Sequence, residues 1–379
     1  MKSDKTTPNV PTLRFKQYHC PWSTYHLSDI AEVVGGGTPD TTVPSLWNGD
    51  IQWFTPTEVG HQKYVSKSAR TITQLGLQKS STKKLPAGSI LLSSRATIGD
   101  CSIAQRECTT NQGFQNLIPK NDTNNEFLYY LAQTKKHHFI KYASGSTFLE
   151  ISNSEIKKTK CTVPGTEEQT QIAAFLSALD DRIAVQNKII SKYETLIKGL
   201  CDMIFPSIEG SILPLKAIVS IEKGQQINGM SLAKTGKYYY LNGGIAPSGY
   251  IDDYNTSEET ISISEGGNSC GFVSYNLQKF WSGGHCYTLK IMAEQCRSKY
   301  LFFYLKYKEK DIMQLRVGSG LPNIQKKSLE NFNVILPNYK KQCFVERIFE
   351  VVTAKKEIEN ALLERFQSQK KFLLSKMFI

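Results

Sequence analysis

The side chains that could carry out chemistry are scattered along this 379-residue chain and form no recognisable catalytic motif. His137 and His138 are adjacent in a segment expected to be helical, where neighbouring residues point apart and cannot share a metal. Gly35-Gly36-Gly37 leads into Thr38-Pro39 and opens no helix that could hold a phosphate. The sequence has no Asn-Pro-Pro-Tyr/Phe motif for base methylation and no Gly-Lys-Ser/Thr loop for a nucleoside triphosphate. We therefore expect no catalytic residue, metal site or cofactor in this chain.

Polar chemistry is concentrated in loops rich in Gly, Asn, Gln, Ser and Thr, which can approach a duplex and offer donors and acceptors to base edges. The candidates in the first half are Gly37, Thr38, Arg95, Thr97, Asn111, Gln112, Ser144, Ser146 and Thr147. Those in the second half are Gln225, Gln226, Asn228, Asn242, Gly243, Gly244, Asn268, Arg316 and Ser319. Candidates for neutralising phosphates are Lys135, Lys136, Lys141, Lys326 and Lys327. Ordinary surface turns and solvated charges are the alternative interpretation of these residues.

The net charge of +12 is unevenly distributed along the chain. Residues 1–165 carry +7 and residues 206–337 carry +3, as expected of surfaces that neutralise phosphates. Residues 166–205 carry −2 and residues 338–379 carry +4, so these two segments have opposite signs that suit mutual packing. A basic protein without a nucleic-acid partner remains the alternative on charge alone.

The candidate loops and lysines must be positioned by a duplicated scaffold. Residues 145–205 align without a gap on residues 318–378 at an offset of 173. Identical pairs include Gly145 with Gly318, Pro164 with Pro337, Gln169 with Gln342 and Phe205 with Phe378. A repeat this long indicates a duplicated domain with its helix, since solenoid units are about 20–50 residues long.

The two oppositely charged segments predict long helices that pair as an antiparallel intramolecular coiled coil. Their apolar residues alternate in steps of four and three, as in a heptad seam. Each helix is about 40 residues long and needs a packed partner to be stable. Two separate core helices of two domains are the alternative. The predicted seam consists of Ile172, Leu176, Leu179, Ile183, Ile190, Tyr193, Ile197, Leu200, Val345, Phe349, Val352, Leu362, Phe366 and Leu373.

The segments outside the helices predict two mixed domains in an α+β fold with a pseudo-twofold repeat. Short β-type runs separated by Gly, Pro and Asn turns precede one helix in each half, at about 125–142 and 298–315. The resulting boundaries are a first domain at 1–163, a first long helix at 164–206, a second domain at 207–337 and a second long helix at 338–379.

Several stretches resemble the specificity subunit of Type I restriction-modification systems, over nearly the whole chain. Residues 85–99 (LPAGSILLSSRATIG) with Thr110-Asn-Gln-Gly-Phe114 are similar to one family stretch. Residues 264–274 (SEGGNSCGFVS) with Gly283-Gly-His285 are similar to its variant form. Residues 166–183 (TEEQTQIAAFLSALDDRI) are similar to the opening of the first conserved helix. The second domain departs from the first by having Gly266-Gly-Asn-Ser269 in place of the Arg-Ala-Thr-Ile-Gly pattern.

The resemblance implies a non-catalytic reader of double-stranded DNA, with two target-recognition domains that each bind half of a split, asymmetric site. It also implies that the helix pair sets the spacer and docks two methyltransferase subunits, which restriction/translocase subunits then join. S-adenosylmethionine, ATP and Mg would be bound by those partners. The holoenzyme would be an adenine-specific DNA methyltransferase and an ATP-dependent endonuclease.

Two other classes remain possible from the sequence. One is a coiled-coil adaptor that binds only proteins, and the other is a self-contained restriction-modification enzyme, for which the assigned segments leave no room. Hydrophobic residues make up 40% of the chain and no apolar run reaches the ~18–20 residues that span a bilayer. The nine cysteines form no Cys-x-x-Cys pair, so we expect reduced thiols and a cytoplasmic location.

Overall fold

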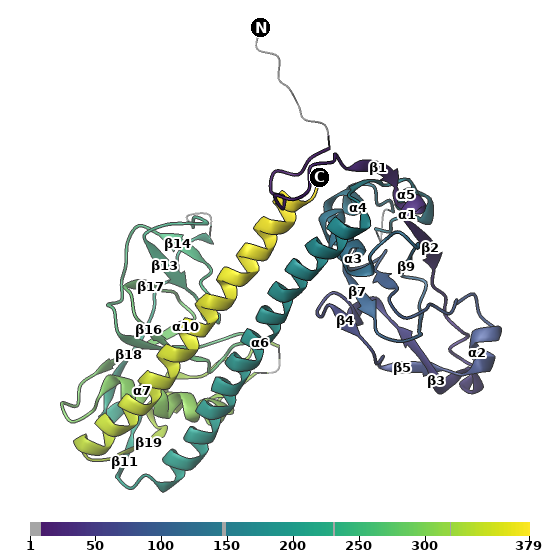
Figure 1. Cartoon of the computed structure of the whole chain (residues 1–379). Coiled ribbons are helices and arrows are strands. Elements are labelled where there is room, and N and C mark those ends of the chain that lie inside the picture. The colour runs from purple at the N-terminus through teal and green to yellow at the C-terminus, as the bar shows by residue number, and fades with distance from the viewer. Residues whose placement is uncertain (1–8, 146–148, 230–231, 319) are drawn as a thin grey trace. The chain divides into compact units, whose positions relative to one another are not determined.

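The chain forms two compact units, each holding one globular domain and one half of each long helix (Figure 1). Unit 1 comprises residues 1–187 and 361–379, and unit 2 comprises residues 188–360. Among the described residues, none of the helices is both long enough and apolar enough to cross a membrane. The computed structural model describes residues 9–145, 149–229, 232–318 and 320–379.

The domain of unit 1 is built on a five-stranded sheet in the order β2-β9-β6-β7-β4. A three-stranded sheet, β5-β3-β8, and a two-stranded sheet, β1-β10, complete it. The pairs β4–β7 and β3–β8 are parallel, and the other pairs are antiparallel. The strands are β1 (Ser23–His26), β2 (Ala31–Gly35), β3 (Trp47–Phe54), β4 (Tyr64–Val65), β5 (Arg70–Ile72), β6 (Ile90–Leu92), β7 (Cys101–Ala104), β8 (Thr109–Thr110), β9 (Gln115–Pro119) and β10 (Lys160–Val163).

Helix α3 packs against β6 and β7, with Phe127 to Ala132 all buried. The Asn124 side chain caps its first turn by accepting a hydrogen bond from the Phe127 N–H at 3.0 Å. The single helix expected at 125–142 is divided at Lys135, whose backbone leaves the helical region and ends α3. The helices of this domain are α1 (Leu27–Ile30), α2 (Gln74–Gln78), α3 (Asn125–Thr134), α4 (Lys136–Lys141) and α5 (Asn153–Lys158).

The domain of unit 2 repeats this topology. Its four-stranded sheet, β12-β18-β15-β16, has the order of β2-β9-β6-β7, and its three-stranded sheet, β14-β13-β17, again contains one antiparallel and one parallel pair. In both units, the strand that opens the domain pairs with the strand before the long helix. Ser211 is paired with Leu336 in unit 2, just as Ser23 is paired with Val163 in unit 1. The strands are β11 (Ser211–Pro214), β12 (Val219–Lys223), β13 (Tyr238–Leu241), β14 (Gly249–Ile251), β15 (Thr260–Ser264), β16 (Val273–Asn276), β17 (Phe280–Ser282), β18 (Cys286–Ile291) and β19 (Asn333–Leu336).

The helices of unit 2 break where those of unit 1 do. The expected helix at 298–315 is interrupted at Lys308, which is the counterpart of Lys135 in the repeat. The interruption therefore belongs to the duplicated scaffold. These helices are α7 (Ser298–Tyr307), α8 (Glu309–Met313) and α9 (Lys326–Glu330).

The two long helices are α6 (Thr166–Ile204) and α10 (Tyr339–Met377), each 39 residues long. In unit 1, Asp180 of α6 forms an ion pair with Lys370 of α10 at 2.6 Å. In unit 2, Glu194 of α6 forms an ion pair with Lys356 of α10 at 2.9 Å. The residue numbers of the paired α10 lysines decrease as those of the α6 carboxylates increase. The two helices are therefore antiparallel within the coiled coil, as predicted.

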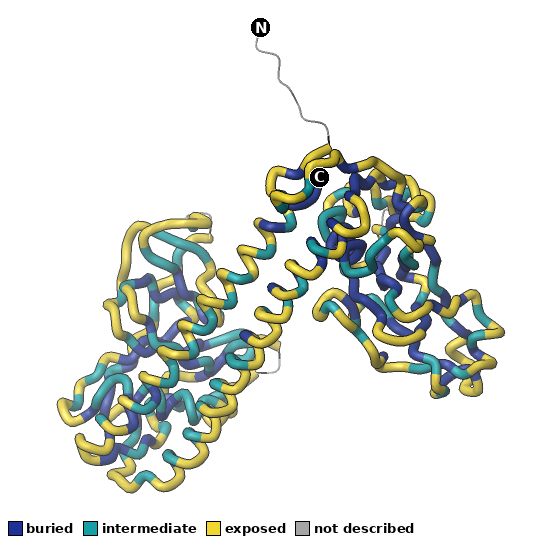
Figure 2. The backbone as a smooth tube through the Cα atoms, in the orientation of Figure 1, coloured by how far each residue is buried: buried dark blue, intermediate teal, exposed yellow. Residues whose placement is uncertain are grey.

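The buried and half-buried residues of α6 follow one heptad pattern from Ile172 to Ile204, with Gln186 in phase and 4% exposed. The predicted α6 seam residues all lie on this pattern. Figure 2 shows how exposed stretches alternate with buried and intermediate ones along the long helices. In α10 the pattern runs through Val345, Phe349, Val352, Lys356, Glu359, Leu363, Phe366, Lys370, Leu373 and Met377.

The placement of Leu362 in the seam was wrong. Leu362 is 36% exposed, whereas neighbouring Leu363 is half-buried on the heptad pattern. Steps of four and three from Val352 reach Lys356, Glu359 and Leu363. Because Lys356 and Glu359 are polar, the sequence does not reveal this heptad phase. The apolar residues Ile358 and Leu362 suggest a different phase instead.

Each unit has its own core next to the helix pair. In unit 1, Phe378 stacks on Phe127 with ring centroids 5.3 Å apart and meets Trp22 edge-on. In unit 2, Phe205 stacks on Phe349 at 5.6 Å. Phe205 and Phe378 occupy matching positions of the repeat, so equivalent side chains close the two cores.

Candidate nucleic-acid interface

The loops of unit 1 that were predicted to read bases are joined to one another by backbone hydrogen bonds. The Gly37 N–H donates to the Thr110 carbonyl at 2.9 Å, next to Asn111 and Gln112. The Gly113 carbonyl accepts from the Ser94 N–H at 2.8 Å, next to Arg95. Loops that follow β2, β6 and β8 therefore form one cluster, which we call loop cluster 1.

Close backbone approach explains the glycines of this cluster. A Cβ on Gly36 would lie 1.9 Å from the Asn111 carbonyl oxygen, and one on Gly37 would lie 2.4 Å from the Thr82 nitrogen. Any larger residue would force the loops apart. The glycines thus hold neighbouring loops at a short distance and cradle no phosphate at a helix start.

Arg95 is the cation of loop cluster 1. Its guanidinium forms an ion pair with Glu150 at 2.8 Å, and their side chains are 43% and 34% exposed. Glu150 also forms paired backbone hydrogen bonds with Ser144, at 2.9 Å each. Ser144 and Glu150 are thereby tied to Arg95, whereas Ser146 and Thr147 lie outside the described residues. Thr97 stabilises the same turn, because its hydroxyl donates to Ser93 Oγ at 3.2 Å.

Some of the predicted base-contacting side chains bond to each other or to their own loop. The Thr38 hydroxyl donates to Gln112 Oε1. Asn111 Oδ1 accepts from the Gly113 N–H at 2.8 Å, which fixes the Asn111 side chain within its turn. Both amides are thus engaged through their oxygens, Gln112 by a neighbouring loop and Asn111 by its own turn.

Unit 2 builds a second cluster from the corresponding loops, which we call loop cluster 2. The Gln225 N–H donates to the Ser282 carbonyl at 2.8 Å, and the Trp281 indole N–H donates to the Gln225 carbonyl at 2.8 Å. The Asn242 side-chain oxygen accepts from the His285 N–H at 3.0 Å. Gln226, Gly244 and Asn228 belong to the same loops.

The 264–269 segment joins loop cluster 2 through Gly243. The hydroxyls of Ser264 and Ser269 both donate to the Gly243 carbonyl, at 2.5 and 2.6 Å. This places Asn268 beside that loop. Arg316 lies near Cys270, where burial raises the pKa of the thiol and the positive charge of Arg316 opposes that shift. Ser319 lies outside the described residues.

Equivalent hydrogen bonds show that the two clusters occupy the same place in the fold. The Asn111 N–H donates to the Phe54 carbonyl at 3.0 Å in unit 1, and the Gly283 N–H donates to the Leu241 carbonyl at 2.8 Å in unit 2. The bridge of Ser144 with Glu150 likewise recurs at the matching positions of the repeat as Val317 with Asn323. The scaffold of the loops is thus duplicated while their side chains differ.

Most of the predicted phosphate-neutralising lysines contact a group of their own unit. Lys135 donates to the carbonyl oxygen of Ile379 at 3.0 Å, at the C-terminal end of the chain. Lys136 forms an ion pair with Asp100 at 2.5 Å, close to loop cluster 1. Lys141 lies over the Tyr142 ring, and Lys326 lies 3.8 Å from Glu330. Lys327 lies in α9, and its role in neutralising phosphates stays a prediction.

The histidines beside these lysines form no metal site. His138 lies 4.5 Å from Tyr142 between ring centroids, and burial lowers the pKa of its imidazole, with smaller contributions from Lys135 and Lys141. Within the described ranges, no group of three His, Cys, Asp or Glu side chains could hold a metal ion.

Sequence reasoning missed the acidic residues of both clusters, Glu150 and Glu265. Glu265 is 8% exposed and accepts hydrogen bonds from Lys223 and His285. Each carboxylate is paired with a cation from a distant segment, which no local pattern indicates. Comparing the two halves at two slightly shorter offsets than that of the long helices would have aligned Glu265 with Ser94 (offset 171) and His285 with Gly113 (offset 172).

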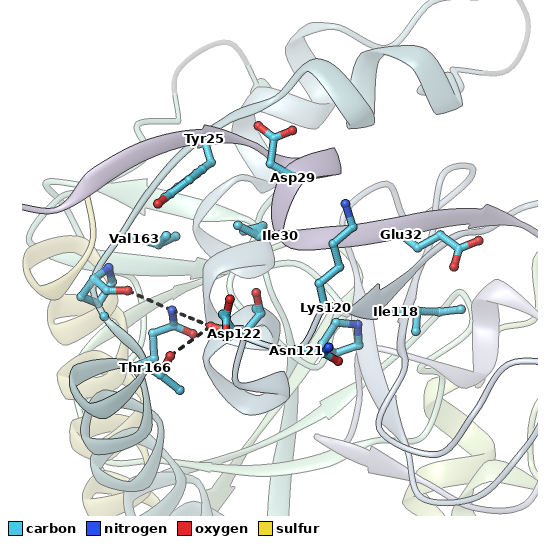
Figure 3. A pocket seen from close by; sticks show the side chains of 15 residues that line it. Tyr25, Asp29, Ile30, Glu32, Ile118, Lys120, Asn121, Asp122, Val163 and Thr166 are labelled. Atoms are coloured by element: carbon cyan, nitrogen blue, oxygen red, sulfur yellow. Dashed lines mark hydrogen bonds between the residues drawn. The ribbon is translucent and has the colours of Figure 1, made fainter.

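A separate pocket of about 640 Å³ lies at the start of α6 in unit 1 (Figure 3). The carboxylates of Asp29, Glu32 and Asp122 line it, and the Lys120 ammonium is engaged with the Ser28 carbonyl at 2.7 Å. The Gln169 side chain donates to the Asp122 carbonyl at 3.4 Å at its edge. An acidic pocket repels phosphates, so it is no part of a nucleic-acid interface.

The fold and its two loop clusters define a duplicated protein with two equivalent domains. The model of the "Type I restriction modification DNA specificity domain" family matches residues 20–195 and 212–367. The chain therefore belongs to the family of Type I restriction-modification specificity subunits and carries two target-recognition domains. This confirms the family resemblance and the two-domain α+β fold predicted from the sequence.

Individual relatives agree over most of the chain. The MjaIX specificity subunit of Methanocaldococcus jannaschii is 30% identical over 358 residues, covering 83% of each chain. A crystal structure of the S subunit from M. genitalium has a TM-score of 0.68 at 19% identity and covers 98% of this chain and 99% of that one. A chain from a study of complex assembly in the type I system has a TM-score of 0.57 at 17% identity, over 95% and 98% of the two chains. At these identities the two solved structures support the fold alone.

Proposed function

We propose that this chain is the non-catalytic DNA-reading subunit of a Type I restriction-modification complex, with each domain reading one half of a bipartite asymmetric site in double-stranded DNA. The observation that carries the proposal is that loop clusters 1 and 2 share backbone connections and differ in side chains. Two domains that read two different sequences require the same loop backbone with different polar side chains.

The helix pair sets the spacer between the half-sites and docks two methyltransferase subunits. Val185 and Ile358 support this docking role, because they occupy matching positions of the repeat and are 54% and 66% exposed. An apolar side chain repeated on the outer face of each helix suits two copies of one partner. Restriction/translocase subunits join through the methyltransferase core.

Chemistry in this proposal belongs to the partners. The methyltransferase subunits bind S-adenosylmethionine and methylate adenine, and the restriction/translocase subunits bind ATP and Mg and cut DNA. The present chain binds none of these cofactors and acts in the cytoplasm, where its DNA and its reduced cysteines would be found.

The test is a methylation assay on a pool of duplexes with random sequence, with and without methyltransferase subunits. We expect no methyl transfer by the chain alone. With the partner added, at two copies per chain, the methylated molecules should share two short sequences separated by a fixed unspecified spacer. A single continuous motif, or methyl transfer by the chain alone, would contradict the proposal.

A further inference from the structure

The two loop clusters carry different side chains at two pairs of equivalent positions. Ser94 and Glu265 are equivalent because their N–H groups donate to the carbonyls of Gly113 and His285, at 2.8 and 2.9 Å. Their own carbonyls accept from the N–H groups of equivalent isoleucines, at 3.1 and 2.8 Å. Unit 2 therefore has a carboxylate and an imidazole where unit 1 has a hydroxyl and a hydrogen.

Two neighbouring positions differ in the same way. In unit 1, β2 ends at Gly35, which is paired with Gln115 of β9. In unit 2, β12 ends at Lys223, which is paired with Tyr287 of β18. Each of the four unit 2 side chains is larger or more readily charged than its counterpart in unit 1. The four are Lys223, Glu265, His285 and Tyr287.

These four side chains form one hydrogen-bonded group around Glu265. Its carboxylate accepts from Lys223 Nζ at 2.5 Å and from the Tyr287 hydroxyl at 3.3 Å through one oxygen, and lies 3.2 Å from His285 Nδ1 through the other. Burial, followed by the charge of Glu265, raises the pKa of Tyr287 to about 12, so its hydroxyl stays a donor. The Tyr287 hydroxyl has a single proton, which it shares with the Ile324 carbonyl at 3.1 Å. Lys223 and His285 therefore hold the buried carboxylate, with Tyr287 beside it.

His285 lies in the middle of loop cluster 2. A Cβ on Gly243, whose φ is +76°, would lie 2.6 Å from the His285 carbonyl oxygen, and one on Gly266 would lie 3.8 Å from His285 Nδ1. A Cβ on neighbouring Gly284 would lie 3.0 Å from Gln226 Oε1. The close approach to the His285 carbonyl and the positive φ together require glycine at position 243, whereas a Cβ at position 266 would make ordinary van der Waals contact with the imidazole.

The geometry assigns the two ring nitrogens of His285 different roles. Because a carboxylate only accepts hydrogen bonds, Nδ1 carries the proton shared with Glu265, and Nε2 is left for another partner. The imidazole is 63% exposed, whereas the Glu265 side chain is 11% exposed. The carboxylate thus acts as a buried anchor and the imidazole as the group presented to solvent.

We propose that His285 is a specificity-determining residue of the second domain, contacting a base edge through Nε2, and that Glu265 is its positioning residue. The inference rests on the proposed function and identifies one of the residues that read the second half-site. Loop cluster 1 uses a guanidinium instead, held by Glu150. The two domains thereby recognise their half-sites with different hydrogen-bonding groups in one frame.

The experiment measures base preference at every position of the methylated motif, using the full complex and the pool of random duplexes. His285→Ala should reduce the preference at one or two base pairs of one half-site by about 5-fold or more, the range of a good base contact. Glu265→Gln, which keeps an acceptor for Nδ1, should weaken the preference at the same position by a smaller factor. The other half-site and the thermal midpoint of His285→Ala should not change. His61→Ala, at an exposed histidine of unit 1, is the matched control.

Failure of the inference differs from failure of the proposed function. A bipartite motif in the unsubstituted complex with identical profiles for His285→Ala at every position would overturn the role of His285. Equal loss of preference in both half-sites would also overturn it, because that pattern indicates general weakening. An unsubstituted complex without a bipartite motif would instead overturn the proposed function.

Discussion

Gln169 and Gln342 make the same hydrogen bonds in the two units. Each donates from Nε2 to the carbonyl of the proline shortly before its long helix, Pro164 or Pro337, at 2.9 Å in both units. Each accepts through Oε1 from the N–H of the residue before α3 or α7, that of Asn124 at 3.0 Å and that of Arg297 at 2.8 Å. A buried amide therefore joins the start of each long helix to the start of the helix covering each sheet.

Replacing either glutamine should destabilise the chain. Gln169→Ala and Gln342→Ala leave buried backbone groups without partners, and we expect each to lower the free energy of unfolding by about 1–3 kcal/mol. Chemical denaturation measures the change. Gln367→Ala, at an exposed position of α10, is the control and should change stability by less than about 0.5 kcal/mol. Equal effects at all three sites would show that the amide bonds contribute nothing.

The two ion pairs between the long helices should differ in strength. Asp180 and Lys370 are 14% and 19% exposed, and Asp180 also accepts from the Tyr130 hydroxyl at 2.7 Å. Lys370→Met should cost roughly 2–3 kcal/mol, somewhat less than for a fully buried pair. Lys356→Met removes the more exposed pair with Glu194 and should cost about 0–1 kcal/mol. Denaturation of the two variants in parallel tests this order, and the reverse order would contradict it.

The sequence predicts periodic and local features well, and contacts between distant segments poorly. The heptad phase of α6 follows from its apolar residues, whereas Lys356 and Glu359 hide the phase of α10 and lead to Leu362 in place of Leu363. Loop composition also predicts which turns could approach DNA, and that assignment stays a prediction. Pairs such as Arg95 with Glu150 join segments that are far apart in the sequence, and only the folded chain brings them together.

Alkaline pH should destabilise the folded chain through its buried thiols. Burial raises the pKa of the Cys161 and Cys286 thiols to about 11 from the ordinary value of 9.0. Since the unfolded thiols ionise first, their stabilisation is complete below pH 9 and is lost as the pH rises from 9 to 11. Urea denaturation between pH 7 and 10.5 measures this decline. A Cys161→Ala/Cys286→Ala variant should decline less steeply above pH 9, and an unchanged slope would exclude these two thiols as a cause.

The spacer should follow the length of the helix pair. Inserting four residues after Asn187 and four after Asn360, the last positions before each boundary between the units, adds about 6 Å and turns each helix by about 40°. At ~3.4 Å per base pair, this should lengthen the unspecified spacer by one to two base pairs and preserve both half-sequences. Two-residue insertions turn the seam by about 200° and should prevent assembly. An unchanged spacer in an active four-residue variant would show that the helices do not set the distance.

The most direct test of independent reading by the two domains is exchange of one domain. Residues 207–337 would be replaced by the matching segment of a related specificity subunit, with α6 and α10 kept, and the methylated motif of the complex would be sequenced. We predict that one half of the motif changes to that of the donor while the other half and the spacer stay the same. Simultaneous change of both halves would contradict the claim that the two loop clusters read DNA separately.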